Sequence, residues 1–244
     1  MNSLSRYYLP ASEWAEGTLV LKGDEAHHCV RVLRQKVGDA VEVFDGVGGS
    51  VMGVIAEAGK SRVLVETQGA RAQQSKDTSM HLIQAVPKAG NMELIVQKAV
   101  ELGVRSIQPL VTENTVVKVD AKKVQKWQRV ALEACKQCGQ NYLPEVHQVL
   151  GFNEWIEKPR VPSFEVVAAL DPRSKPLGLV APGAQGASDI SLLVGPEGDF
   201  AQSEYDAVIE SGFQPASLGN IVLRVETATL YCLSVLKFLG GRAG

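Results

Sequence analysis

The first seventy residues alternate short apolar runs with turn residues. Segments that are β-branched or apolar at every second position predict strands. These strands are predicted at Thr18–Leu21, Ala40–Phe44, Val51–Ala56 and Val63–Thr67. One helix is predicted among them, from about Asp24 to Leu33. Several short strands in so few residues indicate a small barrel or sandwich.

A polar stretch without hydrophobic periodicity, Gln68–Ser79, is predicted to be a linker. Beyond it, apolar strands alternate with segments of helical periodicity, which predicts a parallel sheet with helices on both faces. The predicted strands are His81–Val86, Val104–Leu110, Ser163–Leu170, Ser191–Val194 and Pro215–Leu218. The predicted helices are Asn91–Leu102, Ala121–Cys138, Ser203–Ser211 and Glu226–Leu239. We therefore expect an α/β protein with two domains, residues 1–72 and 73–244.

The composition is that of a globular protein, with 45% hydrophobic and 21% charged residues. No apolar run is long enough to cross a bilayer, and the first residues lack the apolar core of a secretory signal, so we expect a cytoplasmic protein. The net charge is −2, but residues 71–130 hold ten basic and five acidic side chains. This excess is compatible with a nucleic-acid partner. A solvated lysine-rich helix face at Lys118–Arg129 explains it equally well.

Cysteine and histidine residues give only weak signals of a metal site. Cys135 and Cys138 resemble half of a zinc site, but no second pair follows at a suitable spacing, and both are predicted on the apolar face of a helix. His27 and His28 would point about 100° apart on a helix. We therefore predict no metal and reduced, packed thiols. The sequence also lacks the motifs of ATP-binding and serine-hydrolase sites.

Two C-terminal segments each join the end of a predicted strand to a glycine-bearing loop. Leu192–Phe200 contains a Gly-Pro-Glu-Gly turn, and Ser217–Ala228 runs from a strand through a loop into a helix. Ligands of open α/β sheets bind beyond the carboxyl ends of the strands, and glycine lets a ligand approach the backbone closely. From spacing alone, two ordinary turns explain these loops as well as one ligand pocket does.

The same segments resemble a known family. The G-P-E-G turn, followed further along the chain by L-G-x-x-x-L-R-x-E-T-A, is similar to the SPOUT class of methyltransferases. Within that class it resembles the RsmE family, which methylates N3 of a uridine in small-subunit (16S) ribosomal RNA. Further similar blocks are His27–Asp39, Lys88–Val117 and Glu133–Val146. The resemblance covers nearly the whole chain.

This resemblance implies a fold, a cofactor and partners. The implied fold is an N-terminal PUA-like β-barrel that binds RNA and a C-terminal SPOUT domain with a trefoil knot, assembled as a homodimer. The implied cofactor is S-adenosyl-L-methionine, and the substrate is small-subunit ribosomal RNA or the assembled subunit. By resemblance, the cofactor-binding residues are Leu170, Val194, Gly195, Gly198, Leu218, Gly219 and Leu223.

The RNA and catalytic candidates follow from the same interpretation. Candidate RNA-binding residues are Arg6, Arg31 and Arg34 for phosphates, and Lys88, Gln137 and Asn141 for the target nucleotide. A cation near the uracil carbonyls would stabilise the anion that forms as N3 loses its proton, and Arg224 is the candidate. The alternative for Arg224 is a salt bridge to Glu197 or Glu226. Each of these two glutamates is a candidate base, and each could equally accept backbone amides at a helix start.

Two residues depart from the pattern of the family. Asp199 stands where the family usually has a second glycine, and Gln140 stands where it usually has arginine. These departures support an alternative function, a non-catalytic ribosome-assembly factor that binds RNA with the same fold. A nucleotide-dependent oxidoreductase is disfavoured because the dinucleotide-binding fingerprint is missing.

Overall fold

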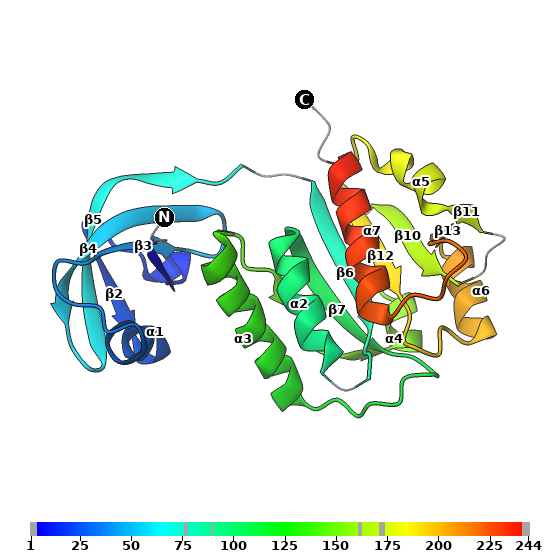
Figure 1. Cartoon of the computed structure of the whole chain (residues 1–244), viewed down its shortest axis with the longest axis horizontal. Coiled ribbons are helices and arrows are strands. Elements are labelled where there is room, and N and C mark those ends of the chain that lie inside the picture. Colours follow the sequence, from blue (N-terminus) through cyan, green and yellow to red (C-terminus); the bar gives the residue numbers. More distant parts are fainter. Residues whose placement is uncertain (1–3, 76–77, 89, 161–162, 171–173, 241–244) are drawn as a thin grey trace. The chain divides into compact units, whose positions relative to one another are not determined.

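The computed structural model describes residues 4–75, 78–88, 90–160, 163–170 and 174–240. The chain forms two compact units (Figure 1). The N-terminal unit comprises residues 1–76 and 132–143, and the C-terminal unit comprises residues 77–131 and 144–244. Residues 132–143 thus fold with the N-terminal unit although they lie far beyond it in the sequence, which no pattern along the chain indicated.

The N-terminal unit is built on a curled five-stranded sheet with the order β1-β3-β4-β5-β2. Its strands are β1 (Ser5–Tyr8), β2 (Thr18–Lys22), β3 (Ala40–Phe44), β4 (Gly49–Ala58) and β5 (Arg62–Gln73). β1 pairs with β3 in parallel, and the other pairs are antiparallel. Every second side chain of β2 and β3 is buried, as at Leu19 and Leu21 or Val41 and Val43. This alternation confirms the strands predicted from a period of two.

Two predictions for this unit were wrong in extent. Half of the predicted linker Gln68–Ser79 belongs to a strand, because β5 continues to Gln73, which pairs with Gly49 of β4. Main-chain hydrogen bonds sustain a strand without apolar side chains, so hydropathy does not detect this extension. The predicted helix is also divided, into α1 (Gly23–His27) and a π-helical turn at His28–Val32.

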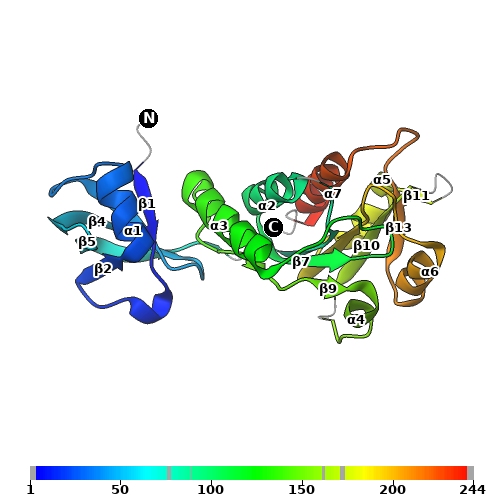
Figure 2. The ribbon, with the colours of Figure 1, turned by 90° about the horizontal axis from the view of Figure 1, so that it is seen from below.

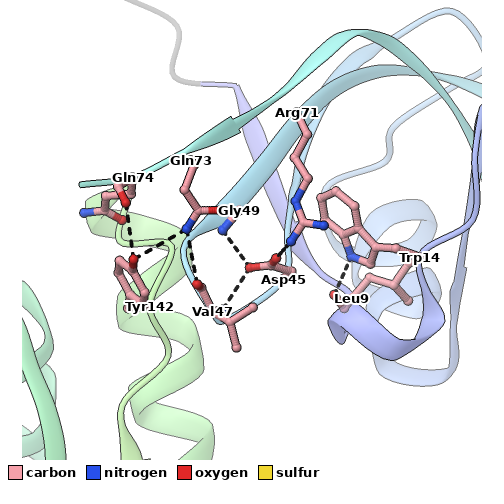
Figure 3. Close-up of polar contacts among 9 residues, drawn as sticks. All are labelled: Leu9, Trp14, Asp45, Val47, Gly49, Arg71, Gln73, Gln74 and Tyr142. Carbon is pink, nitrogen blue, oxygen red and sulfur yellow. Dashed lines mark hydrogen bonds and ion pairs between the residues drawn. The ribbon is translucent and has the colours of Figure 1, made fainter. Parts of the chain in front are cut away.

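A buried carboxylate organises the turn between β3 and β4 (Figure 3). One oxygen of Asp45 accepts the backbone N–H groups of Val47 and Gly49, both at 2.8 Å, and the other oxygen pairs with Arg71 of β5. The Arg71 guanidinium lies over the ring of Trp14, 4.5 Å from its centroid. Burial of a carboxylate is tolerated when it is paired and hydrogen-bonded in this way. The turn is therefore rigidly connected to β5.

The end of β5 also binds the segment 132–143. The Tyr142 hydroxyl donates to the Gln74 carbonyl at 3.2 Å (Figure 3), and the Asn141 N–H donates to Gln74 Oε1 at 2.8 Å. The Gly48 N–H donates to the Asn141 carbonyl at 3.1 Å. Main-chain and side-chain hydrogen bonds thus attach this segment to the end of β5 and to the turn between β3 and β4.

The C-terminal unit contains an eight-stranded sheet, and all of its strand pairs are parallel. The main order is β11-β13-β10-β12-β6-β7-β8, and β9 also pairs with β7. The strands are β6 (Ser79–Ala85), β7 (Val104–Val111), β8 (Glu145–Val146), β9 (Leu150–Gly151), β10 (Phe164–Ala169), β11 (Lys175–Pro176), β12 (Asp189–Val194) and β13 (Gln214–Ser217). The predicted parallel sheet is confirmed. The implied trefoil knot stays a prediction.

Helices cover both faces of this sheet. The helices of this unit are α2 (Asn91–Glu101), α4 (Phe152–Ile156), α5 (Leu177–Val180), α6 (Gln202–Glu210) and α7 (Val225–Gly240). The long helix α3 (Ala121–Cys138) begins in this unit, and its residues from 132 onward belong to the N-terminal unit. Helices α2 and α7 pack side by side on one face, and α4 and α6 lie on the other (Figure 2). The predicted helices are confirmed to within a residue or two, whereas the short elements α4, α5, β8, β9 and β11 were not predicted. Hydrophobic periodicity requires more residues than these elements contain.

The two cysteines of α3 differ in their environments. Cys135 is buried, and burial raises the pKa of its thiol to about 12. Cys138 is exposed, so its predicted packing was wrong, because it is the last residue of α3, where the buried face of the helix ends. In the part of the chain that the structure describes, no group of three or more metal-ligating side chains occurs. No described helix is long and apolar enough to cross a membrane.

Candidate functional site

A cavity of about 540 Å³ opens beyond the carboxyl ends of three neighbouring strands, β13, β10 and β12. Because the three strands are parallel, the loops that follow them meet at one edge of the sheet. The first turns of α2 and α7 complete the walls. Of the predicted cofactor and catalytic residues, those that line the cavity are Leu170, Val194, Gly195, Glu197, Leu218, Gly219, Leu223, Arg224 and Glu226. The structure therefore brings the two C-terminal segments together around one space.

Gly195 follows β12 directly, and a side chain there would be crowded by its neighbours. A Cβ atom there would lie 3.0 Å from Asp199 Oδ1 and 3.1 Å from the Phe200 ring. Phe200 is buried and packs against Phe152, with ring centroids 6.3 Å apart, so it has little freedom to withdraw. Glycine thus keeps the backbone of the loop accessible at the wall of the cavity.

The turn after Gly195 is held from a second loop. Asn114, in the loop after β7, donates from Nδ2 to the carbonyl oxygens of Gly198 and Asp199 at 3.0 and 3.1 Å. Gly198 does not line the cavity. A Cβ on Gly198 would lie 3.2 Å from Cβ of Asn114, so glycine permits this close approach. Gly198, which was predicted to contact the cofactor, therefore allows the turn to pack closely against Asn114 instead of lining the cavity.

Asp199 adopts a left-handed backbone conformation, with φ of 55°. Its N–H donates to the Pro196 carbonyl at 3.0 Å, which closes the turn. Glycine adopts this conformation without strain, and aspartate tolerates it better than most residues do. The backbone thus explains why a glycine suits this position and why aspartate can replace it. Burial raises the pKa of the Asp199 carboxyl, whereas a hydrogen bond from the Phe200 N–H lowers it.

The second loop, after β13, is apolar and open. Gly219 has φ of 112°, and its N–H donates to Ser217 Oγ at 3.3 Å, which bends the chain away from the strand. Ile221 and Val222 line the cavity and are 78% and 79% exposed. Large apolar side chains at this exposure leave a surface suited to an apolar ligand or partner.

The two candidate bases hold neighbouring segments. Glu197 Oε1 accepts the Lys88 N–H at 2.8 Å, and Glu226 Oε2 accepts from Asn91 Nδ2 at 3.2 Å. Arg224 is exposed at the cavity, and its side chain makes no hydrogen bond or ion pair with any residue that the structure describes. The predicted alternative, a salt bridge from Arg224 to Glu197 or Glu226, does not form. The guanidinium remains available to a ligand.

The phosphate-binding candidates have different environments. Arg31 and Arg34 are exposed on and just after the π-helical turn, and Arg34 has φ of 54°. Arg6 is buried, with 8% of its side chain exposed. Its guanidinium donates to Glu42 and to the Cys135 carbonyl, at 2.8 and 2.7 Å, and also to Asn141 Oδ1. Arg6 thus joins β1 to the segment 132–143 within the N-terminal unit.

The candidates for contact with the target nucleotide also differ. Lys88 is exposed after β6, and Gln137 is exposed on the last turn of α3. Asn141 is buried and engaged by Arg6 and Gln74. Gln140 accepts the Tyr142 N–H at 3.2 Å through Oε1, and nothing in the structure explains why arginine is usual there.

Sequence patterns missed two residues at the site, Asn91 and Asn114. Asn91 lines the cavity and binds Glu226, and Asn114 holds the turn after β12. Both follow the carboxyl end of a predicted strand, β6 or β7, and this position is the only signal that could have indicated them.

Two family models match the chain. A model of an RNA methyltransferase domain matches residues 74–237, and a model of an RNA methyltransferase PUA domain matches residues 21–68. The chain is 33% identical to ribosomal RNA small subunit methyltransferase E of Synechocystis over 226 aligned residues. The alignment covers 92% of this chain and 74% of that protein.

Solved structures are similar over the full length. One is ribosomal RNA small subunit methyltransferase E of Neisseria gonorrhoeae, bound to S-adenosyl methionine. It superposes with a TM-score of 0.89 at 29% identity, and the match covers 99% of this chain and 100% of that chain. A Legionella pneumophila methyltransferase in complex with the same cofactor has a TM-score of 0.88 at 33% identity, with coverage of 98% and 99%.

Replacement of Gly195 by alanine is expected to destabilise the C-terminal unit. The added methyl group would press on the Phe200 ring and the Asp199 carboxylate, at an expected cost of about 1–3 kcal/mol. The matched control is Gly178→Ala in α5, where a Cβ meets nothing within 4 Å. The control should be neutral or gain up to about 1 kcal/mol. Thermal denaturation compares the two, and equal melting temperatures would contradict the packing described for Gly195.

Proposed function

Because the chain belongs to the ribosomal RNA small subunit methyltransferase E family, we propose that it methylates N3 of one uridine in 16S ribosomal RNA, using S-adenosyl-L-methionine. The observation that carries this proposal is the cavity formed where the loops of both C-terminal motifs meet. A cytoplasmic location, where small-subunit ribosomal RNA is available, is part of the proposal.

The residues around the cavity fit this cofactor. Its volume, about 540 Å³, is within the range of pockets that hold ligands of this size. The walls combine apolar side chains with accessible backbone, which suits an adenine ring and its hydrogen-bonding edge. We assign cofactor binding to Leu170, Val194, Gly195, Leu218, Gly219 and Leu223, with Gly198 shaping the turn. When bound, S-adenosyl-L-methionine supplies an electrophilic methyl group on a sulfonium.

The chain's own residues must then position the uridine and help it to lose the N3 proton. The Arg224 side chain is exposed at the cavity and has no partner among the described residues, so its guanidinium can approach the uracil carbonyl oxygens. A fixed cation there would stabilise the negative charge that develops as the proton leaves. Positioning of both reactants supplies much of the remaining reduction in the barrier.

Glu197 and Glu226 remain alternative proton acceptors. In the structure each anchors a neighbouring segment, through the Lys88 N–H or through Asn91. A carboxylate has two oxygen atoms and about four acceptor positions, so one such bond leaves each group able to accept a proton. The geometry does not distinguish the two residues, and we retain both.

RNA binding is assigned to exposed cations of both units. Arg31 and Arg34 lie beside the π-helical turn of the N-terminal unit, and Lys88 follows β6. Gln137 is accessible for a contact with the nucleotide, whereas Arg6 and Asn141 are occupied by partners within the chain. We therefore propose a structural role for the latter pair. The target base must be unstacked before its N3 can be reached.

The reaction itself can be tested with purified components. The chain, given S-adenosyl-L-methionine and small subunits that lack base methylation, should produce N3-methyluridine, detected by mass spectrometry of the nucleosides. If the chain binds ribosomal RNA but neither binds the cofactor nor forms a methylated nucleoside, the alternative of a non-catalytic assembly factor is correct.

Replacement of Arg224 by alanine tests its catalytic role. We expect kcat to fall about 100-fold, as for the loss of a single charge-stabilising donor. Cofactor affinity, measured by calorimetry, should change little, because the guanidinium faces the uridine. Lys158→Ala, an exposed cation just after α4 and outside the cavity, is the control and should be neutral. Unchanged kcat in the Arg224 variant would remove it from the mechanism.

Charge reversal at Arg31 and Arg34 tests the RNA surface. The double glutamate variant should bind ribosomal RNA more weakly. The slope of log affinity against log salt should fall by about 0.7–0.9 for each phosphate that the protein no longer neutralises. Lys60→Glu, on an exposed turn of the same unit, is the control. Fluorescence anisotropy at several salt concentrations measures both quantities, and identical slopes would exclude these arginines from the interface.

We also propose that the chain forms a homodimer through α2 and α7. Three large apolar side chains are exposed on this helix pair: Leu94, Tyr231 and Phe238, at 40%, 46% and 62%. Such groups mark interaction surfaces. Analytical ultracentrifugation should give a dimer that Phe238→Glu dissociates and Leu179→Glu, on exposed α5, does not. A monomeric wild-type chain would contradict the proposal.

A further inference from the structure

The cavity is acidic, although the proposed substrate is a polyanion. Among the lining residues that the structure describes, Glu197, Asp199 and Glu226 are acidic and only Arg224 is basic. Carboxylates at such a site repel phosphates, so each requires an explanation. Glu197 and Glu226 have one, since they hold neighbouring segments through Lys88 and Asn91. Asp199 anchors no other segment: its carboxylate accepts the N–H of the adjacent Phe200, and no side chain among the described residues donates to it.

The position of Asp199 is nevertheless fixed through its backbone. The backbone is held on both sides, by the N–H bond to Pro196 at 3.0 Å and by the bond from Asn114 to the Asp199 carbonyl at 3.1 Å. Its Oδ1 lies 3.0 Å from where a Cβ of Gly195 would be. The carboxylate therefore lies against Gly195, at the wall of the cavity, where a side chain on residue 195 would crowd it.

We propose that Asp199 determines specificity for the charge of the cofactor, by placing its carboxylate near the sulfonium of S-adenosyl-L-methionine. This inference rests on the proposed function. The product, S-adenosyl-L-homocysteine, is a neutral thioether at the same position. Asp199 thus favours the donor over the product and hastens the exchange of one for the other after each transfer.

The electrostatic argument is consistent with the environment of Asp199. Burial disfavours the ionised carboxylate, and a cation within the cavity offsets that cost. A positive charge close to a carboxyl group lowers the pKa of that group by one unit or more. By the same coupling, the ionised carboxylate raises the affinity for the positively charged ligand. One unit corresponds to about a tenfold difference in affinity between the charged donor and the neutral product.

A purely conformational role for Asp199 makes a different prediction. If the side chain served only the turn, its loss would alter the affinities for donor and product together. Asparagine also tolerates the left-handed conformation, and glycine adopts it without strain. Asp199→Asn and Asp199→Gly therefore both remove the charge while keeping the backbone geometry.

The test is isothermal titration calorimetry of the full chain with S-adenosyl-L-methionine and with S-adenosyl-L-homocysteine. For Asp199→Asn and Asp199→Gly, the preference for the donor over the product should fall about tenfold relative to the wild-type chain. Asp206→Asn, the same chemical change at an exposed position of α6 outside the cavity, should leave the preference unchanged.

The outcomes are distinct. An unchanged preference in the Asp199 variants, or parallel losses of both affinities, overturns the inference and leaves the proposed function intact. A wild-type chain that binds neither compound contradicts the proposed function itself. A preference that falls in both Asp199 variants but not in Asp206→Asn supports the assignment of the carboxylate to the sulfonium.

Discussion

Parallel pairing of β13, β10 and β12 is the constraint on which the site depends. It brings the carboxyl ends of three strands to one edge, so loops that are distant in the sequence converge there. Gly195 keeps the backbone of one loop open, and Gly219 bends the other away from its strand. Without that convergence, the two motif segments would be two unrelated turns, an interpretation that their spacing in the sequence does not exclude.

A fourth strand, β7, also contributes to the site, because the loop that follows it holds the turn after β12. Asn114, beyond β7, binds two carbonyl groups of the turn, and buried Glu204 accepts the N–H groups of Glu113 and Ala201. These bonds fix the left-handed conformation of Asp199, and so determine where its charge lies. A departure from the pattern of the family thus becomes a feature of the cavity with a physical role of its own.

Much of the fold could be predicted from the sequence, because long apolar strands and amphipathic helices carry a clear period. The buried strand at Leu192–Val194 and the buried face of α3 around Trp127 are examples. The polar end of β5 and the return of residues 132–143 to the N-terminal unit were missed, since main-chain pairing and distant polar contacts leave no period in hydropathy. Arg6 illustrates the same limit among the predicted RNA-binding residues. Its charge indicated a phosphate contact, whereas its partners Glu42 and Asn141 lie far away in the sequence.

The most direct test of the account is a crystal structure of the chain with S-adenosyl-L-methionine. We predict that the cofactor occupies the cavity beyond β13, β10 and β12, in contact with the backbone at Gly195 and in the segment Leu218–Leu223. Arg224 should line the space left for a uracil beside the cofactor. A cofactor bound elsewhere on the chain, or held by side chains remote from these two loops, would contradict the central claim.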